Sequence, residues 1–261
     1  MSLVTTTLAQ LSEYARPGFW YGLGILTAIY LVFIFVAAMS ERRFTRPYAE
    51  AASVRPGTPI DSYHAAVNDG AAAAGFLYGG TFQHRRYDVR VSLWISPDRL
   101  TLIEAGAGTI MRSRVRQTDV FSRAGENVVL ATSDHYGEGD PSGLIRFDHH
   151  YNGSLDNLLA LHSRRIGSAG GPPIPFDEPS PLDALNGIYA QRAERLVRAG
   201  RAKWLDDRHD FWRYTLRGSI CVCRGFFTQL ANALSRFWRR WRPRPGELQG
   251  SRPLPRDYPP P

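Results

Sequence analysis

The longest apolar run of the chain covers residues 18–39, which read GFWYGLGILTAIYLVFIFVAAM and contain no charged side chain. As a helix, such a run rises about 33 Å, enough to cross the hydrocarbon core of a bilayer. Arg16 precedes the run, whereas Arg42, Arg43 and Arg46 follow it closely. The pattern predicts a single transmembrane helix with the short N-terminal residues 1–17 outside and the rest of the chain in the cytosol.

A cleaved signal peptide and a buried core helix are the alternatives to a membrane anchor. A signal peptide has an apolar core of about 7 to 15 residues and a cleavage site, whereas this run is longer and arginines follow it at once. We therefore predict an uncleaved anchor. Trp20 and Tyr21 near its N-terminal end are the predicted residues at the membrane interface, where aromatic side chains concentrate.

Residues 75–148 show the alternation of apolar and polar side chains that is typical of strands. The clearest stretch places apolar side chains at every second position: Tyr87, Val89, Val91, Leu93 and Ile95. Pro97-Asp98 and Gly106 to Gly108 predict breaks between strands. About seven closely spaced strands without an intervening helix predict an antiparallel sheet or barrel, in which each strand buries one face.

The segments on either side of these strands differ from them in composition. Residues 40–74 are polar and interrupted by Pro and Gly, so we predict a connector with at most one short helix. On the other side, Ser154 is suited to cap a helix over residues 155–165, whose apolar side chains lie on one face.

The order of these elements over residues 75–166, strands followed by one amphipathic helix, resembles a pleckstrin-homology domain. The resemblance implies a small antiparallel barrel with the helix in one open end; other small barrels and a split sheet are alternatives. It also implies an anionic ligand at the first hairpin, with Arg85, Arg86 and Arg90 as the contact residues. An ordinary solvated charged turn is the alternative interpretation of these arginines.

Residues 167–179 form a Gly- and Pro-bearing linker, and a second region, 180–242, follows it. Ser180 and Pro181 predict a helix start, and a hairpin follows around residues 206–210. This helix and hairpin resemble the recognition helix and wing of winged-helix domains, which implies nucleic-acid binding. Only one helix precedes the hairpin, however, so we regard nucleic acid as a disfavoured partner.

A further helix is predicted from Ile220 to Trp241, with an apolar stripe on one side and arginines on the other. Such a helix either packs on protein or lies on a membrane surface. The second interpretation predicts five more residues at the membrane interface. These are Phe237, Trp238, Arg239, Arg240 and Trp241. The tail, residues 243–261, is Pro-rich, and we predict an extended or disordered segment.

The net charge of +8 comes almost wholly from arginine, because Lys203 is the only lysine. This skew suggests high-GC coding and a bacterial source. A basic cytosolic surface attracts anionic lipid headgroups or nucleic acid. Cys221 and Cys223 would lie in a reducing compartment, so we predict neither a disulfide nor a zinc site.

One local cluster resembles an acid–base or metal site: His135, Asp148, His149 and His150. If residues 144–150 form a strand, His149 and His150 point to opposite faces and do not share an ion. Asp148 and His150 are then expected on one face with His135. We predict no metal site, because the ligand geometry is poor.

The predicted fold class is therefore one transmembrane helix followed by an α+β cytosolic part. In that part, an antiparallel barrel or sheet capped by a helix precedes a helix–hairpin–helix appendage. The predicted function is a non-enzymatic, single-pass protein of the bacterial inner membrane that scaffolds a membrane complex, with no cofactor. Its predicted partners are the bilayer, other subunits and anionic headgroups. A membrane-tethered nucleic-acid-binding regulator is the alternative, and an enzyme using His135, Asp148 and His150 ranks last.

Overall fold

The computed structural model describes residues 17–50, 61–110, 113–135, 140–150, 154–169 and 172–224. The chain divides into two units, residues 1–226 and 227–261, and every described residue belongs to the first. The N-terminal residues before 17, the part of the predicted helix Ile220–Trp241 beyond residue 224 and the predicted extended tail lie outside the described residues.

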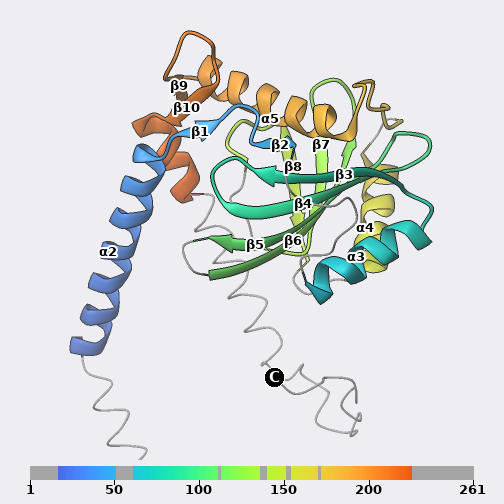
Figure 1. The fold of residues 1–261 in the computed structure, drawn as a ribbon. Helices are drawn as coiled ribbons and strands as arrows, with labels where there is room; N and C mark the ends of the chain where they lie inside the picture. The colour runs from blue at the N-terminus through green and yellow to red at the C-terminus, as the bar shows by residue number, and fades with distance from the viewer. Residues whose placement is uncertain are drawn as a thin grey trace, which may run out of the picture. The chain divides into compact units, whose positions relative to one another are not determined.

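Seven strands form the central sheet, and three short strands form a second one (Figure 1). The large sheet has the order β2 (Tyr48–Glu50), β3 (Leu77–His84), β4 (Asp88–Ile95), β5 (Leu102–Ile110), β6 (Ser113–Arg123), β7 (Val129–Ser133) and β8 (Ile145–His149). Its neighbouring strands are antiparallel except β7 and β8, which are parallel. The small sheet has the order β1 (Arg43–Phe44), β10 (Phe211–Tyr214) and β9 (Ala202–Trp204).

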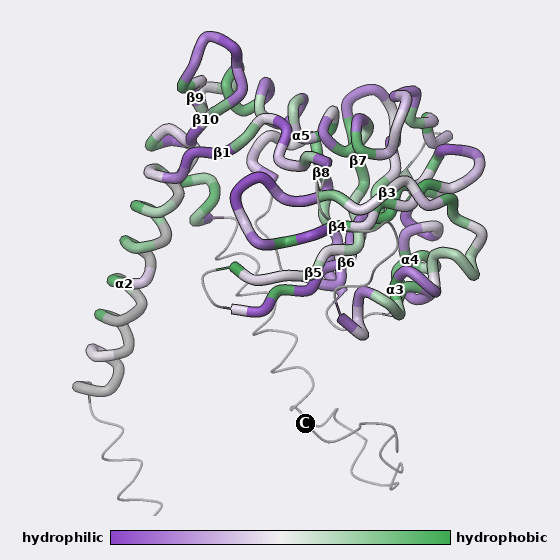
Figure 2. The backbone as a smooth tube through the Cα atoms, in the orientation of Figure 1, coloured by the Kyte–Doolittle hydropathy of each residue, from purple (hydrophilic) through white to green (hydrophobic). Residues whose placement is uncertain are grey.

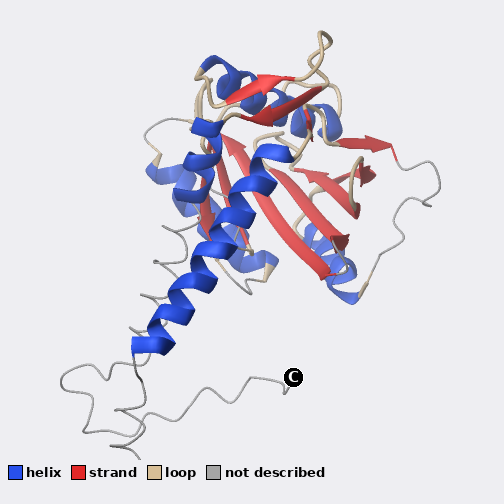
Figure 3. Cartoon of the chain, turned by 90° about the vertical axis from the view of Figure 1, so that its left-hand side faces the viewer, coloured by secondary structure: helices blue, strands red, loops and turns tan. Residues whose placement is uncertain are grey.

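The labelled helices are α2 (Pro17–Ser40), α3 (Ser62–Ala73), α4 (Leu155–Ser168) and α5 (Pro181–Arg198), and residues 216–224 are helical as well. Figures 1 and 3 show helices on both sides of the large sheet. On one face, Leu93 and Phe121 share a core with Leu185 and Ile188 of α5. On the other face, Val120 and its neighbours form a second core with α3 and α4.

The helices begin where their capping residues predict. Ser180 accepts a hydrogen bond from the Asp183 amide at 3.1 Å and is followed by Pro181, so the predicted start of α5 is confirmed. Ser154 caps α4 in the same way, as predicted. Asp61, which the sequence analysis did not single out, caps α3.

The apolar N-terminal run forms a helix, as predicted. The structure does not support a membrane span for this helix, however. Several large apolar side chains of α2 are exposed: Tyr21, Ile25, Ile29, Tyr30, Val32, Phe33 and Val36. Among the residues that the structure describes, no helix combines the length and the apolar character needed to cross a membrane. The predicted transmembrane helix, and with it the single-pass inner-membrane protein with a cytosolic bulk, is therefore wrong. An uncharged apolar run is sufficient to predict a helix. That such a helix crosses a membrane is a separate inference, and the search of the described helices overturns it.

Of the two predicted alternatives, an antiparallel sheet or a barrel, the described strands form an open sheet, because their order runs from β2 at one edge to β8 at the other without closing. Helix α4 lies against a sheet face, where Leu158 joins the core around Ile103. The prediction that the strand over residues 87–95 buries only one face is also wrong, because helices pack on both faces of the sheet. In β4, every residue from Val91 to Ile95 is buried, since helices cover both faces.

The glycines predicted to break the sheet instead lie inside β5. A side chain at Gly108 would meet the Asp88 carbonyl of the neighbouring strand, because a Cβ there would lie 2.0 Å from that oxygen. Glycine at this position therefore permits a close approach of two strands rather than a turn. The predicted hairpin around residues 206–210 is confirmed as β9 and β10, and its loop is strongly hydrophilic (Figure 2).

Candidate functional site

A cavity of about 270 Å³ lies where the segment after α2, the β3–β4 turn, α5 and β10 meet. Its cationic lining residues are Arg42, Arg43, Arg86 and Arg192. Its aromatic lining residues are Phe44, Tyr48, Tyr87, Tyr189 and Trp212. We call this cavity the arginine–aromatic pocket. Glu41 is its single lining carboxylate.

Glu41 organises the cationic side of this pocket. Its carboxylate lies 2.8 Å from Nη2 of Arg43 and 3.3 Å from Nη1 of Arg86, and it accepts a hydrogen bond from the Tyr87 hydroxyl. Arg86 also donates to the main-chain carbonyl of Arg42 at 2.6 Å. One carboxylate therefore holds two guanidinium groups at the pocket, and the lining keeps an excess of positive charge.

The remaining cation, Arg192, reaches the pocket from α5. Its Nε lies 2.9 Å from Oδ1 of Asp140, whose side chain is fully buried. This ion pair is shielded from water, so it holds the guanidinium more firmly than an exposed pair would. Arg192 is therefore a fixed part of the pocket wall.

Helix α5 also positions the aromatic side of the pocket. The side-chain amide of Asn186 accepts from the Tyr48 amide at 3.3 Å and donates to the Tyr48 carbonyl at 3.2 Å. In this way the Asn186 side chain pairs with the backbone N–H and C=O groups at the outer edge of β2, as a neighbouring strand would. The Tyr48 ring lies 6.0 Å from the Tyr189 ring and 5.5 Å from His84, both edge to face. Tyr48 is thus held by the backbone and by two rings.

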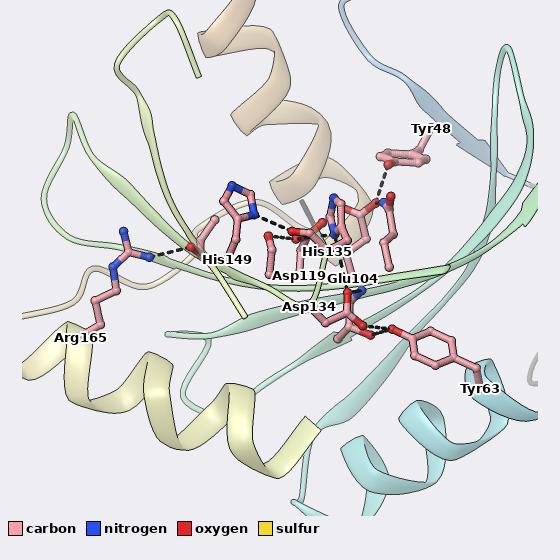
Figure 4. Close-up of polar contacts among 12 residues, drawn as sticks. Tyr48, Tyr63, Glu104, Asp119, Asp134, His135, His149 and Arg165 are labelled. Atoms are coloured by element: carbon pink, nitrogen blue, oxygen red, sulfur yellow. Dashed lines mark hydrogen bonds and ion pairs between the residues drawn. The ribbon is translucent and has the colours of Figure 1, made fainter. Parts of the chain in front are cut away.

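The Tyr48 hydroxyl leads from the pocket into a buried acid cluster, shown in Figure 4. It donates to Oε1 of Glu104 at 2.5 Å, and Gln117 donates to the same oxygen at 3.1 Å. Oε2 of Glu104 is buried and has no hydrogen-bond partner within the described part of the chain. Burial, together with the neighbouring charge of Asp119, raises the pKa of Glu104 to about 8. Glu104 is therefore largely a neutral carboxylic acid at pH 7.

Asp119 lies directly opposite Glu104 in the pairing of β5 with β6. It accepts a hydrogen bond from the Ser133 hydroxyl, and its Oδ1 lies 3.8 Å from Nδ1 of His135. Burial raises the pKa of Asp119. Burial alone would lower the pKa of His135, but Asp134 and Asp119 outweigh it, so this pKa is raised. The protonated imidazole of His135 is therefore the positive charge that balances the carboxylates of the cluster.

The cluster continues to the other face of the sheet through Asp134. Its Oδ1 lies 3.6 Å from Nδ1 of His135 and accepts from the Thr118 amide at 2.7 Å. Its Oδ2 accepts from the hydroxyl of Tyr63, which comes from α3. Burial and this hydrogen bond to Asp134 raise the pKa of Tyr63. Polar contacts therefore connect the pocket side of the sheet to the α3 side.

The described residues contain no group of three or more His, Cys, Asp or Glu side chains placed to hold a metal ion. In the acid cluster, hydrogen-bond donors from the protein already occupy one oxygen of Glu104 and one of Asp119. What this arrangement can do chemically is store and exchange a proton close to a cationic pocket.

The three arginines predicted to contact an anionic ligand lie in different places. Arg86 lines the arginine–aromatic pocket, whereas Arg90 lines a separate cavity that also contains Asp61. The guanidinium of Arg85 lies over the Phe44 ring, 5.7 Å from its centre. The structure therefore brings only one of the three into the pocket.

Of the predicted membrane-interface residues, Tyr21 is 71% exposed on α2. The side chain of Trp20 lies outside the part that the structure describes, as do Phe237, Trp238, Arg239, Arg240 and Trp241.

The histidine cluster forms, but with other partners than predicted. His150 pairs with Asp148 at 2.9 Å, and neither of them joins His135. It is His149 that approaches His135: its Nδ1 donates to the His135 carbonyl at 2.6 Å. The reason is the parallel pairing of β7 with β8, which places Ser133 opposite His149 and so brings the residues after β7 to that side chain.

Sequence reasoning missed Tyr48, Glu104, Asp119 and Arg192. A signal was present for two of them, because Glu104 follows Leu102 and Ile103 in an apolar strand and Asp119 directly precedes Val120. A carboxylate inside a strand that is buried on both faces requires a special environment. The arginine and the tyrosine carry no comparable local signal.

Comparisons with protein-family models, with curated proteins and with solved structures find no match for this chain. The resemblances to pleckstrin-homology and winged-helix domains stay predictions.

Proposed function

We propose that this protein is a binding module for a small organic anion, which it holds in the arginine–aromatic pocket. The observation that carries the proposal is the lining of that cavity by four arginines and five aromatic side chains, with one carboxylate. At about 270 Å³, the cavity fits a small ligand, such as a ring bearing one phosphate or carboxylate group.

The chemistry of the lining supports this ligand class. Guanidinium groups present paired N–H donors that match phosphate and carboxylate oxygens. Aromatic walls add stacking area for a planar group. The side chain of Arg86 is 39% exposed, so a ligand can reach it and compete with Glu41 for its donors.

The same geometry favours binding over catalysis. The group best suited to acid–base chemistry, Glu104, is fully buried and does not line the cavity. The hydroxyl of Tyr48 is directed to Glu104 and is occupied by that hydrogen bond. A general acid or base must be within hydrogen-bond reach of the group that it serves. The lining groups of that kind are Glu41 and His84, and protein groups already engage both. Glu41 holds Arg43 and Arg86, and Nδ1 of His84 accepts from the main-chain amides of Arg86 and Tyr87.

Isothermal titration calorimetry of the full chain with phenyl phosphate, benzoate and inorganic phosphate tests the proposal. We expect phenyl phosphate or benzoate to bind more tightly than inorganic phosphate, because only these two fill the aromatic side. Arg86→Gln should weaken binding about tenfold, the usual effect of losing one charge-assisted hydrogen bond. Arg90→Gln is the matched control, since it removes an arginine of the same hairpin that lies outside the pocket.

Two results would refute the proposed function. The first is the absence of measurable binding of all three probes at millimolar concentration. The second is an equal loss of affinity in Arg86→Gln and Arg90→Gln, which would indicate a general charge effect instead of this pocket.

A further inference from the structure

We infer that anion binding in the arginine–aromatic pocket is coupled to the uptake of one proton by the Glu104–Asp119 carboxyl pair, with Tyr48 as the connection between them. This inference rests on the proposed function and adds to it a proton-dependent selection of the ligand. Glu104 and Asp119 do not line the pocket, so in this coupling they set the local charge without touching the ligand.

Tyr48 places the carboxyl pair close to the pocket. One side of this residue lines the cavity, while its hydroxyl lies 2.5 Å from Oε1 of Glu104. The ring and the hydroxyl belong to one rigid group that Asn186 holds through the backbone. A negative charge on Glu104 therefore lies one hydrogen bond from the hydroxyl of a residue of the pocket wall. At that distance in a protein interior, two like charges repel appreciably.

The surroundings of Glu104 contain too few positive charges to keep it ionised. The groups that face it are Tyr48 from β2, Asp119 from β6, Tyr189 from α5 and His135 after β7. On its β4 side, it is paired with the apolar Leu93. His135 is the only cation among these groups, and Asp119 and Asp134 already share it. The fully buried Glu104 is the carboxyl group that is left to hold a proton.

The pocket lining itself contributes little titration near pH 8. Burial and Arg86 lower the pKa of His84 to about 4, and burial together with Glu41 raises the pKa of Tyr87 to about 12. Burial also raises the pKa of Tyr48 and of Tyr189. Protons that exchange on binding between pH 7.5 and 9 therefore come from the acid cluster behind the wall.

The sign of the effect follows from these positions. Below the pKa of Glu104, which is about 8, the acid is neutral and does not oppose an incoming anion. Above it, Glu104 is ionised, so either the anion binds weakly or Glu104 takes up a proton on binding. Ligand affinity should fall as the pH rises from 7.5 to 9.

Calorimetry with phenyl phosphate at pH 7.5, 8 and 9, in two buffers of different ionisation enthalpy, measures affinity and proton uptake together. For the wild type, we expect about a fivefold to tenfold loss of affinity from pH 7.5 to 9, with net proton uptake that increases from pH 7.5 to pH 9. Glu104→Gln keeps an acceptor for the Tyr48 hydroxyl but stays neutral. Its affinity should change less than twofold over this range. Glu126→Gln, at an exposed carboxylate, should retain the wild-type dependence.

Tyr48→Phe supplies a second test if Glu104→Gln does not fold. The hydrogen bond from Tyr48 lowers the pKa of Glu104, so its loss should move the midpoint of the pH dependence to higher pH. The proton count of the wild type requires no variant at all. Binding with equal affinity at pH 7.5 and 9 and without proton uptake would overturn this inference and leave the proposed function intact. If none of the probes binds, the proposed function itself fails.

Discussion

The buried carboxyl of Glu104 should make the stability of the protein depend on pH, and Glu104→Gln should remove that dependence. Burial and Asp119 raise the pKa of this group in the folded protein from 4.5 to about 8. The folded state therefore binds the proton more tightly than the unfolded state does. The resulting stabilisation is complete below pH 4.5 and is lost as the pH rises through 8.

The size of the effect follows from the pKa change. At 1.36 kcal/mol per pKa unit, the full loss is roughly 5 kcal/mol, of which about 4 kcal/mol falls between pH 5 and pH 9. Glutamine has nearly the shape of the protonated acid and accepts the same hydrogen bonds, but it does not ionise. The free energy of unfolding of Glu104→Gln relative to the wild type should therefore increase by about 4 kcal/mol from pH 5 to pH 9.

Urea denaturation at pH 5, 7 and 9, followed by circular dichroism, measures this difference. With a typical dependence on urea of about 2 kcal/mol/M, the midpoint of the variant minus that of the wild type should increase by about 2 M from pH 5 to pH 9. The comparison cancels the titrating groups that lie far from Glu104, which both proteins share. Glu126→Gln, exposed on a turn, should follow the wild type. A change of less than about 1 kcal/mol between pH 5 and pH 9 would show that Glu104 is not a buried acid with a raised pKa.

Three further substitutions test the packing around the site. Leu158→Ala, at a fully buried position of α4, should lower the free energy of unfolding by about 2 to 5 kcal/mol in urea titration. Leu159→Ala, at a partly buried neighbouring position, should lower it by clearly less. Gly108→Ala should cost at least about 2 kcal/mol, because the new methyl group would overlap the backbone of β4, whereas Gly167→Ala, with open space around it, should be neutral in the same assay. Asn186→Ala should cost about 1 to 3 kcal/mol and speed hydrogen exchange in β2, since it removes both side-chain hydrogen bonds to that strand. Equal effects of the paired variants, or unchanged exchange in β2, would contradict the packing described here.

Local patterns were sufficient to predict many of the individual elements. Alternation from residue 87 to 95 predicted β4, and Ser154 and Ser180 predicted the starts of α4 and α5. The turn residues around 206–210 predicted the β9–β10 hairpin. Each of these signals depends on neighbours within a few positions, which is the range over which capping, turn geometry and side-chain periodicity act.

Other conclusions required information that a local pattern does not contain. The apolar run at 18–39 specifies a helix, but the inference of a membrane span from it is overturned. The alternation in β4 predicted one buried face, but helices distant in sequence cover both faces of the sheet. Gly106 and Gly108, which predicted a break between strands, lie inside β5. At Gly108 the backbones of β4 and β5 approach each other closely. In β4 and β5 the deciding contact comes from a segment outside the pattern.

The sequence by itself was sufficient to predict β4, the β9–β10 hairpin and the starts of α4 and α5, but it did not single out Glu104 or Asp119. Only the tertiary structure decided that these two carboxyl groups lie opposite each other, because the pairing of β5 with β6 sets their register. It also decided that Tyr48, 56 positions from Glu104, reaches that pair, and that Arg192 of α5 lines the same pocket as Arg86. Sites of this kind arise from long-range packing, in which residues far apart in the chain share one environment that none of them specifies alone.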